Sequence, residues 1–315
     1  MSFRILVTGS SGFIGSTLVS ALVAAGHDVR AASRRPDKTA NQDHVEWVEL
    51  PNLENEVDWE PLLSGIDIVV HLAAIAHRSQ AQGIEYARAN RHATAGLAHA
   101  CRRHMIKRLV FISSIGAQAG SAAYHVVTEA DEPKPTTAYD RAKLAAEEEI
   151  RRSGVPFTIL RPVIVYGPGA KANIALIMRI AALPLPLPFG AFRNQRSLLA
   201  IDNLVQAIVV SLASPETLNQ IFIVCDQEPI TLADMLATLR EAAGRPPRLI
   251  PVPPLAVRAM LIVAGRHALW DRIGRELVAS SANLQKAGWL PQVETKAGLR
   301  AMVRATLDAP IHRSD

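Results

Sequence analysis

The sequence predicts an α/β protein: a doubly wound parallel sheet with a smaller C-terminal domain. Short apolar runs alternate with helical patterns through the first half of the 315 residues. The runs at 68–70 and 109–112 are apolar without alternation, which is typical of parallel strands covered by helices on both faces. A glycine-rich turn at 9–15 joins the first run to the first helical pattern, as strand-to-helix turns of such sheets do.

The predicted strands follow the apolar runs in chain order. We expect them at 4–8, 28–32, 45–50, 67–72, 108–113 and 156–160, with a further strand at 219–225 returning to the sheet. The prolines within 181–190 exclude a regular helix, so we expect an extended segment there, near a substrate entrance. This pattern predicts a sheet domain over 1–165, with a return at about 196–226, and a smaller, mainly substrate-binding domain over 166–315.

The glycine-rich turn has the spacing of a phosphate-binding turn. Gly9 permits the tight turn, Gly12 lets the backbone approach a pyrophosphate, and Gly15 lets the helix lie close to the strand. The start of the following helix presents free N–H groups and a partial positive charge to phosphates. We therefore predict a Rossmann-type, dinucleotide-binding domain, whose cofactor contacts here also include Ser11, Phe13 and Ile14.

A second motif, Tyr139 with Lys143, carries acid–base chemistry. The two residues are four apart on a predicted helix and so share one face. An ammonium and an oxidised nicotinamide nearby would both favour the phenolate, so we expect the pKa of Tyr139 to be lowered towards neutrality. Tyr139 could then act as general base or general acid while the cofactor carries a hydride.

These two motifs, in this order, resemble the extended short-chain dehydrogenase/reductase family, and within it the nucleotide-sugar epimerases, dehydratases and reductases. The resemblance spans nearly the whole chain and is weakest over 240–280. It implies that Ser114 completes a catalytic triad with Tyr139 and Lys143 and also contacts the substrate. It implies that Asn173 and Arg196 bind the substrate diphosphate, and a solvated arginine is the competing interpretation for Arg196.

The resemblance also extends the cofactor site. It implies contacts from Asn52, Leu53, Leu72, Ala73, Ala74, Asn90, Ser113 and Pro162, besides Tyr139 and Lys143. Asn90 would stiffen the sheet and help to place the active site, although a plain polar helix residue is the competing interpretation. His71 is interpreted as a buried core histidine. The family further implies a homodimer through the helices around 86–101 and 141–152.

The end of the second strand bears on cofactor choice. An acidic residue there would bind a ribose 2′-hydroxyl, whereas an arginine accommodates a 2′-phosphate. The stretch ends in Ser33 and Arg34 with no acid, which favours NADP(H) and leaves NAD(H) possible. In the competing interpretation Arg34 is an ordinary solvated loop residue.

Three functions follow from these motifs. Ile115 and Gly116 stand where the dehydratases of the group have an Asp-Glu pair, which argues against a dehydratase. We expect an oxidoreductase acting at C4 of a nucleotide sugar, with a UDP-sugar as the preferred substrate and a 4-keto-sugar reductase placed first. A 4-epimerase of UDP-glucose or UDP-N-acetylglucosamine with tightly bound NAD is the alternative. A non-catalytic dinucleotide sensor is a more remote one.

Composition narrows partners and location. The net charge of +5 is scattered and not interleaved with aromatic residues, so we expect no nucleic-acid partner. No apolar run is long enough to span a bilayer and the first strand starts at once, so we expect no signal peptide and no membrane partner. Cys101 and Cys225 lack metal or redox spacing, which predicts buried reduced thiols, no metal site and a cytoplasmic location.

Overall fold

The central feature of the structure, a computed structural model, is a seven-stranded sheet in the order β11-β7-β5-β4-β1-β2-β3. The structure describes residues 2–36, 43–75, 83–266, 269–270 and 273–308. Every neighbouring pair of strands in this sheet is parallel. The strand order reverses between β1 and β4, and the crevice at such a reversal is where α/β sheets bind their ligands.

The strands confirm the predicted doubly wound sheet. They are β1 (Arg4–Thr8), β2 (Asp28–Ser33), β3 (Val45–Glu49), β4 (Ile68–His71), β5 (Arg108–Ile112), β7 (Phe157–Pro162) and β11 (Gln220–Val224). Each coincides with a predicted run to within two residues. The last of them is the strand that was expected to return to the sheet, and it pairs with β7 at the edge.

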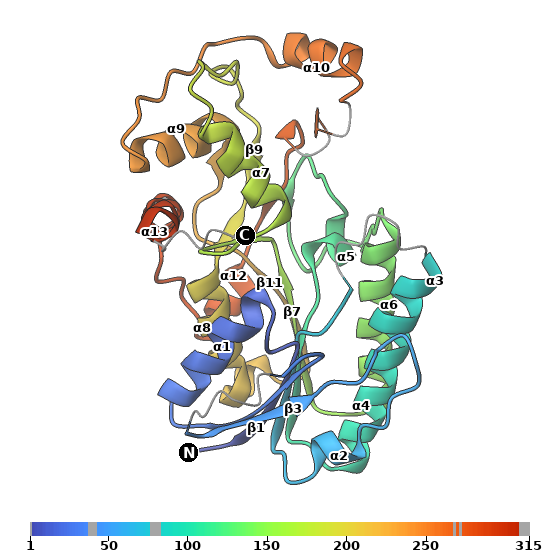
Figure 1. The fold of residues 1–315 in the computed structure, drawn as a ribbon. Coiled ribbons are helices and arrows are strands. Elements are labelled where there is room, and N and C mark those ends of the chain that lie inside the picture. The colour runs from blue at the N-terminus through green and yellow to red at the C-terminus, as the bar shows by residue number, and fades with distance from the viewer. Residues whose placement is uncertain (1, 37–42, 76–82, 267–268, 271–272, 309–315) are drawn as a thin grey trace.

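Helices cover both faces of the sheet (Figure 1). One face carries α1 (Phe13–Ala24), α8 (Ile201–Ala213) and α12 (Ala282–Lys286), and the other carries α2 (Glu60–Leu63), α3 (Gly83–Tyr86), η1 (Ala87–His92), α4 (Ala93–Arg103) and α6 (Ala138–Ser153). The side chains of each strand alternate between two cores, so that Ile5 and Val7 pack under α1 while Leu6 packs on the α4 side. This two-sided burial explains the uninterrupted apolar runs in the sequence.

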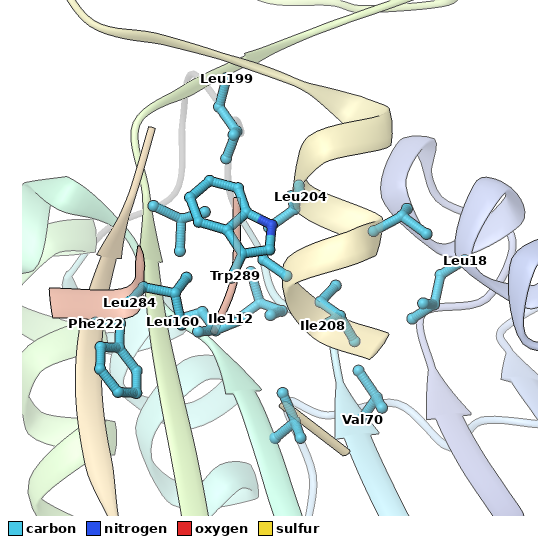
Figure 2. Close-up of a cluster of buried hydrophobic side chains, with 14 of the residues drawn as sticks. Leu18, Val70, Ile112, Leu160, Leu199, Leu204, Ile208, Phe222, Leu284 and Trp289 are labelled. Atoms are coloured by element: carbon cyan, nitrogen blue, oxygen red, sulfur yellow. The ribbon is translucent and has the colours of Figure 1, made fainter. Parts of the chain in front are cut away.

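Trp289 links the C-terminal part of the chain to the sheet core. The ring is fully buried, and Figure 2 shows it among the apolar side chains of that face, beside Leu204 of α8. Leu284 of α12 belongs to the same cluster. The segment that contains α12 and Trp289 is therefore anchored on the sheet.

The remaining elements lie outside the sheet, and several of them surround a third, separate hydrophobic core. They comprise α5 (Ile115–Ala119), α7 (Ala172–Ala181), α9 (Leu232–Ala242), α10 (Pro254–Val263), α13 (Thr295–Asp308), η2 (Pro215–Thr217), β6 (Val126–Val127), β8 (Ile164–Tyr166), β9 (Gln195–Arg196), β10 (Leu198–Ala200), β12 (Ile230–Thr231) and β13 (Val278–Ala279). The helices α7, α9 and α13 supply most of this core, through side chains such as Ile174, Leu236 and Leu299. In the ranges described, no helix combines the length and apolar character needed to cross a membrane.

Candidate functional site

The glycine turn is shaped by close contacts of backbone with backbone. Gly9 has a φ of +77°, and a Cβ there would lie 2.9 Å from the backbone nitrogen of Ala73. A Cβ on Gly15 would lie 2.2 Å from the carbonyl oxygen of Gly9. Gly12 is the N-cap of α1 and provides no capping side chain. The first turn of α1 therefore keeps its backbone N–H groups for a ligand, and an anion is the ligand that a helix N-terminus favours.

A cavity of about 350 Å³ lies against this turn. Ten of the predicted cofactor residues line it: Gly9, Ser11, Gly12, Ser33, Arg34, Asn52, Leu53, Leu72, Ala73 and Ala74. Phe13, Ile14 and Gly15 form the adjoining first turn of α1. The fold thus brings together segments that are more than 60 residues apart in sequence, at the strand-order reversal between β1 and β4.

Two serine hydroxyls beside this cavity lack partners. The Oγ atoms of Ser10 and Ser33 are buried, and neither has a hydrogen-bond partner within the described part of the chain. Buried hydroxyls are nearly always hydrogen-bonded, so the hydroxyl of Ser33, which lines the cavity, fits a polar ligand there. The sequence analysis included Ser33 and missed Ser10, although Ser10 lies inside the glycine motif.

The loops that border the cavity differ in exposure and in bonding. Arg34 is exposed at the cavity wall, as either interpretation of this residue requires. The Oδ1 atom of Asn52 accepts a hydrogen bond from the backbone N–H of Glu54 at 3.1 Å. Asn52 therefore shapes its own turn through Oδ1. Within the described residues, its side-chain NH₂ group makes no hydrogen bond of this kind.

A directed hydrogen-bond chain runs beneath the end of β4 through His71. Burial, reinforced by Lys143, lowers the pKa of His71 to about 3, so the ring is neutral. Its Nδ1 lies 2.7 Å from Oγ1 of Thr8 and its Nε2 lies 3.1 Å from Oγ1 of Thr94. Because Thr94 donates to the carbonyl of Asn90, its hydroxyl accepts from His71, and His71 in turn accepts from Thr8. His71 is thus the satisfied core histidine predicted from the sequence.

Asn90 lies at one end of this chain and fixes the loop after β4. Its Oδ1 accepts from the backbone N–H of Ile75 at 2.8 Å, and its Nδ2 donates to the Ile75 carbonyl at 2.9 Å. Asn90 lies in the π-helical segment η1, a distortion that is frequent at functional sites. It therefore acts as a positioning residue for the loop that lines the cavity, and its predicted cofactor contact stays a prediction.

The start of α6 places Tyr139 and Lys143. A capping box between Thr137 and Asp140 begins the helix, so that Tyr139 lies in the first turn and Lys143 one turn later. Gly116 permits this packing, because a Cβ there would lie 2.0 Å from a carboxylate oxygen of Asp140. Ser114, the N-cap of α5, accepts a hydrogen bond from the backbone N–H of Gly116 at 3.1 Å.

Lys143 is a buried cation held by neutral groups. Its Nζ donates to the carbonyl of Ile112 at 2.7 Å and lies 4.4 Å from the centre of the Phe111 ring. Burial lowers its pKa to about 7, against the opposing effect of Glu147. The site therefore holds an ammonium that exchanges its proton near neutral pH.

The pKa of Tyr139 departs from the expectation. Loss of solvent raises it, and the nearby Asp140 and Tyr86 raise it further. Lys143, whose Nζ donates to the carbonyl at the end of β5, does not lower this pKa. The protein's own groups thus do not lower the pKa of Tyr139, and the expected lowering, which includes an oxidised nicotinamide, stays a prediction for the cofactor-bound protein.

A buried ionic network lies one turn further along α6, and the sequence analysis missed it. Glu147 and Arg161 form an ion pair, with Nη2 of Arg161 2.5 Å from Oε2 of Glu147. The hydroxyl of Ser113 donates to Glu147, and Gln118 accepts from Arg161. The Ser113 side chain is therefore committed to α6, and its predicted cofactor contact stays a prediction. The available signal was the spacing, since Glu147 lies four residues after Lys143.

The residues expected to bind substrate lie outside the glycine-turn cavity. Asn173 is half-buried in the first turn of α7, and Arg196 is buried on β9. Nε of Arg196 donates to the carbonyl of Arg275 at 2.9 Å, and burial with the nearby Arg275 charge lowers its pKa to about 10. No carboxylate pairs with Arg196 among the residues described, which leaves its positive charge for an anion. Pro162 ends β7.

Known proteins resemble this chain along most of its length. A family model described as the NAD dependent epimerase/dehydratase family matches residues 5–225. A UDP-glucose 4-epimerase of Vibrio cholerae is 33% identical over 321 aligned residues, covering 98% of this chain and 97% of that protein. The solved structure of UDP-glucuronic acid 4-epimerase from Bacillus cereus in complex with NAD has a TM-score of 0.76 at 21% identity, with 96% of both chains covered. MoeE5 in complex with UDP-glucose and NAD has a TM-score of 0.75 at 26% identity, covering 96% of this chain and 98% of MoeE5.

Proposed function

Because the chain belongs to the NAD dependent epimerase/dehydratase family, we propose that it is a 4-epimerase of a UDP-sugar, working with bound NAD. The observation that carries the proposal is the nearly full-length similarity to the V. cholerae UDP-glucose 4-epimerase. The sequence analysis placed a 4-keto-sugar reductase first and this epimerase second. The relatives support the second over the first, and the structures that bind NAD support NAD over the NADP(H) that Arg34 favoured.

The cavity at the glycine turn fits a dinucleotide. The uncapped start of α1 would hold the pyrophosphate, and the orphan hydroxyl of Ser33 would find its partner on the ribose of the adenosine half. The backbone of Leu72 to Ala74 lines the cavity and is held in place by Asn90 through Ile75. When bound, NAD would supply reversible hydride transfer at C4 of the sugar.

The chain's own residues would handle the proton. Tyr139 would take the proton of the C4 hydroxyl and return it to the same oxygen, and Ser114 would hydrogen-bond that oxygen. The raised pKa of Tyr139 keeps it protonated in the protein alone, so its activation depends on positive charge arriving with the oxidised cofactor. Lys143 lies on the same face of α6, and in the protein alone it does not lower that pKa. Arg196 and Asn173 would hold the diphosphate of the substrate.

The reductase is kept as a second candidate because of one observation. The end of β2 carries no acidic side chain, and Arg34 is exposed at the cavity wall, where a 2′-phosphate would be accommodated. An enzyme that releases its cofactor after each turnover would use such a site. We also keep the homodimer through α4 and α6 as a proposal.

The test separates the two candidates by cofactor balance. Purified protein is incubated with UDP-glucose or UDP-N-acetylglucosamine, and the C4 epimer is measured together with absorbance of the reduced cofactor. An epimerase forms the epimer with no net change in cofactor. Stoichiometric oxidation of added NADPH with a UDP-4-keto-6-deoxy-hexose, without epimer formation, would instead establish the reductase.

A matched pair of variants tests the role of Tyr139. Tyr139→Phe should keep the fold and cofactor binding but lose roughly 10²–10⁴ in turnover, the usual contribution of a positioned acid or base. Tyr124→Phe, on a tyrosine that is 97% exposed, is the control and should turn over normally. Near-normal turnover by Tyr139→Phe would rule out the assignment.

A further inference from the structure

Apart from Arg258, helix α10 is apolar around its circumference, and yet it lies on the surface. Of its ten residues, all described by the structure, Val257 is the one that is buried. Val263 is 90% exposed and Leu255 is 73% exposed, and Met260 and Ile262 are also exposed. A helix that is apolar on all sides is normally enclosed by protein or lipid. This helix therefore lacks a covering layer in the isolated chain.

The proline-rich segment after α7 extends the same apolar surface. Its backbone pairs with the segment that leads into α10: the N–H of Leu187 donates to the carbonyl of Arg248, and the N–H of Ile250 donates to the carbonyl of Leu187. Leu183, Leu185 and Ile250 are exposed. Figure 1 shows α10 at the end of the molecule farthest from the N-terminus. The end patch, as we call it, consists of Leu183, Leu185, Ile250, Leu255, Met260, Ile262 and Val263.

A buried arginine holds the leucines of this patch outward. The guanidinium of Arg240, on α9, donates to the carbonyls of Ala181, Leu183 and Leu185, and also to that of Pro247. These bonds hold together the segment after α7 and the segment that leads into α10. The exposure of Leu183 and Leu185 is therefore built into a hydrogen-bonded framework and is not a property of a free loop.

The two segments that carry the end patch hold basic residues and no acidic ones. Residues 182–190 and 244–266 contain four arginines and no Asp or Glu, while the whole chain has a surplus of only five positive charges. The arginines are Arg245, Arg248, Arg258 and Arg266, and all four are exposed. None of them forms an ion pair with any residue in the described ranges.

We propose that the end patch and its four arginines dock this protein on an anionic lipid surface. An apolar helix lying in the plane of a bilayer buries its apolar face, and flanking arginines reach the anionic headgroups. The sequence analysis expected no membrane partner because no segment spans a bilayer, and a helix that lies on the surface needs no such segment. The proposal does not depend on which reaction the enzyme catalyses.

The same observations argue against two other occupants of the end patch, a second copy of this chain and a specific protein partner. A second copy would place the patch against itself in a two-fold interface, and this would bring the arginines of both copies together without any acidic partner. A specific protein partner would need hydrogen-bonding groups at the interface. Apart from Arg258, the exposed residues of α10 carry no polar side-chain group: they are Leu255, Ala256, Ala259, Met260, Ile262 and Val263. A lipid surface needs neither acidic partner residues nor hydrogen-bonding groups on the exposed apolar face.

Vesicle flotation of the purified full-length chain tests the proposal. The vesicles contain either phosphatidylcholine alone or equal parts of phosphatidylcholine and phosphatidylglycerol. The protein should float with the anionic vesicles at low salt and be released at high salt, because surface electrostatics are screened. Arg258→Gln with Arg266→Gln should weaken binding by about 25-fold, since each basic residue near an anionic surface contributes about fivefold. Leu255→Gln with Val263→Gln should weaken it by about tenfold or more.

Matched controls carry the same changes elsewhere on the surface. Met105→Gln with Leu307→Gln removes two apolar side chains of similar exposure, and Arg88→Gln with Arg102→Gln removes two exposed arginines. Both control pairs should bind vesicles like the unmodified protein. Absence of flotation at low salt would overturn the proposal, as would equal losses in patch and control variants. Dissociation of a dimer by the patch variants, measured by sedimentation without vesicles, would also overturn it by making the patch an interface between copies.

Discussion

Replacing Lys143 with methionine should abolish turnover and also change how stability depends on pH. Lys143 is 2% exposed, and its Nζ is bound to the carbonyl of Ile112 and lies over the Phe111 ring. The charged group that acts on it is Glu147, on the same helix, and the nearby titratable His71 is neutral at these pH values. Burial lowers its pKa from 10.5 to about 7. Methionine keeps the length of the stem and removes the titrating group.

The direction of the effect follows from proton linkage. A lysine whose folded pKa lies below its unfolded pKa is deprotonated in the folded protein but still protonated in the unfolded chain between the two values. The unfolded state then binds more protons, so stability rises with pH from about 7 to about 10.5. Below about pH 7 the cost of burying the charge is fully present. Between pH 7 and pH 9 this single group should add about 2 kcal/mol to the free energy of unfolding.

Urea unfolding of the nucleotide-free protein at pH 7, 8 and 9 measures this change. The difference in stability between Lys143→Met and the unmodified protein should shift by about 2 kcal/mol over that range, to the disadvantage of the variant as pH rises. The lost hydrogen bond to Ile112 lowers the stability of the variant by the same amount at each pH, so it does not alter this trend. Lys286→Met, on an exposed lysine of α12, is the control and should run parallel to the unmodified protein. Parallel curves for Lys143→Met would refute the reasoning.

Three further predictions concern the ion pair, the cofactor and the assembly. Glu147→Gln leaves the charge of Arg161 buried without its carboxylate partner and should cost about 3–5 kcal/mol of unfolding free energy. The double variant Glu147→Gln with Arg161→Gln should cost less. Urea midpoints measure both losses, and a larger loss in the double variant would contradict the pairing. Arg34→Ala should raise KM for NADPH and leave NADH use nearly unchanged if Arg34 contacts a 2′-phosphate, and equal effects on both would show that it does not. Sedimentation at micromolar concentration should show a dimer, and a monomer alone would contradict an interface through α4 and α6.

Much of the fold and part of the candidate site were predictable because they depend on local sequence. Uninterrupted apolar runs such as 109–112 identify buried parallel strands, and the structure has β5 there. The spacing of Gly9, Gly12 and Gly15 requires a tight strand-to-helix turn, and the cavity lies against it. Tyr139 and Lys143 share a helical face whatever the rest of the chain does, because they are four residues apart.

The sequence by itself determined the sheet, the glycine turn and the Tyr139–Lys143 pair, since each is encoded within a few neighbouring residues. Only the tertiary structure decided what surrounds them. Ser113 meets Glu147 across 34 positions of sequence, and Ala73 meets Thr8 across 65. The pKa values of Lys143 and Tyr139 follow from burial and from such distant neighbours, and the exposure of α10 follows from which elements fail to cover it. Local patterns carry no information about these contacts, because solvent access and electrostatics are set by where remote segments meet.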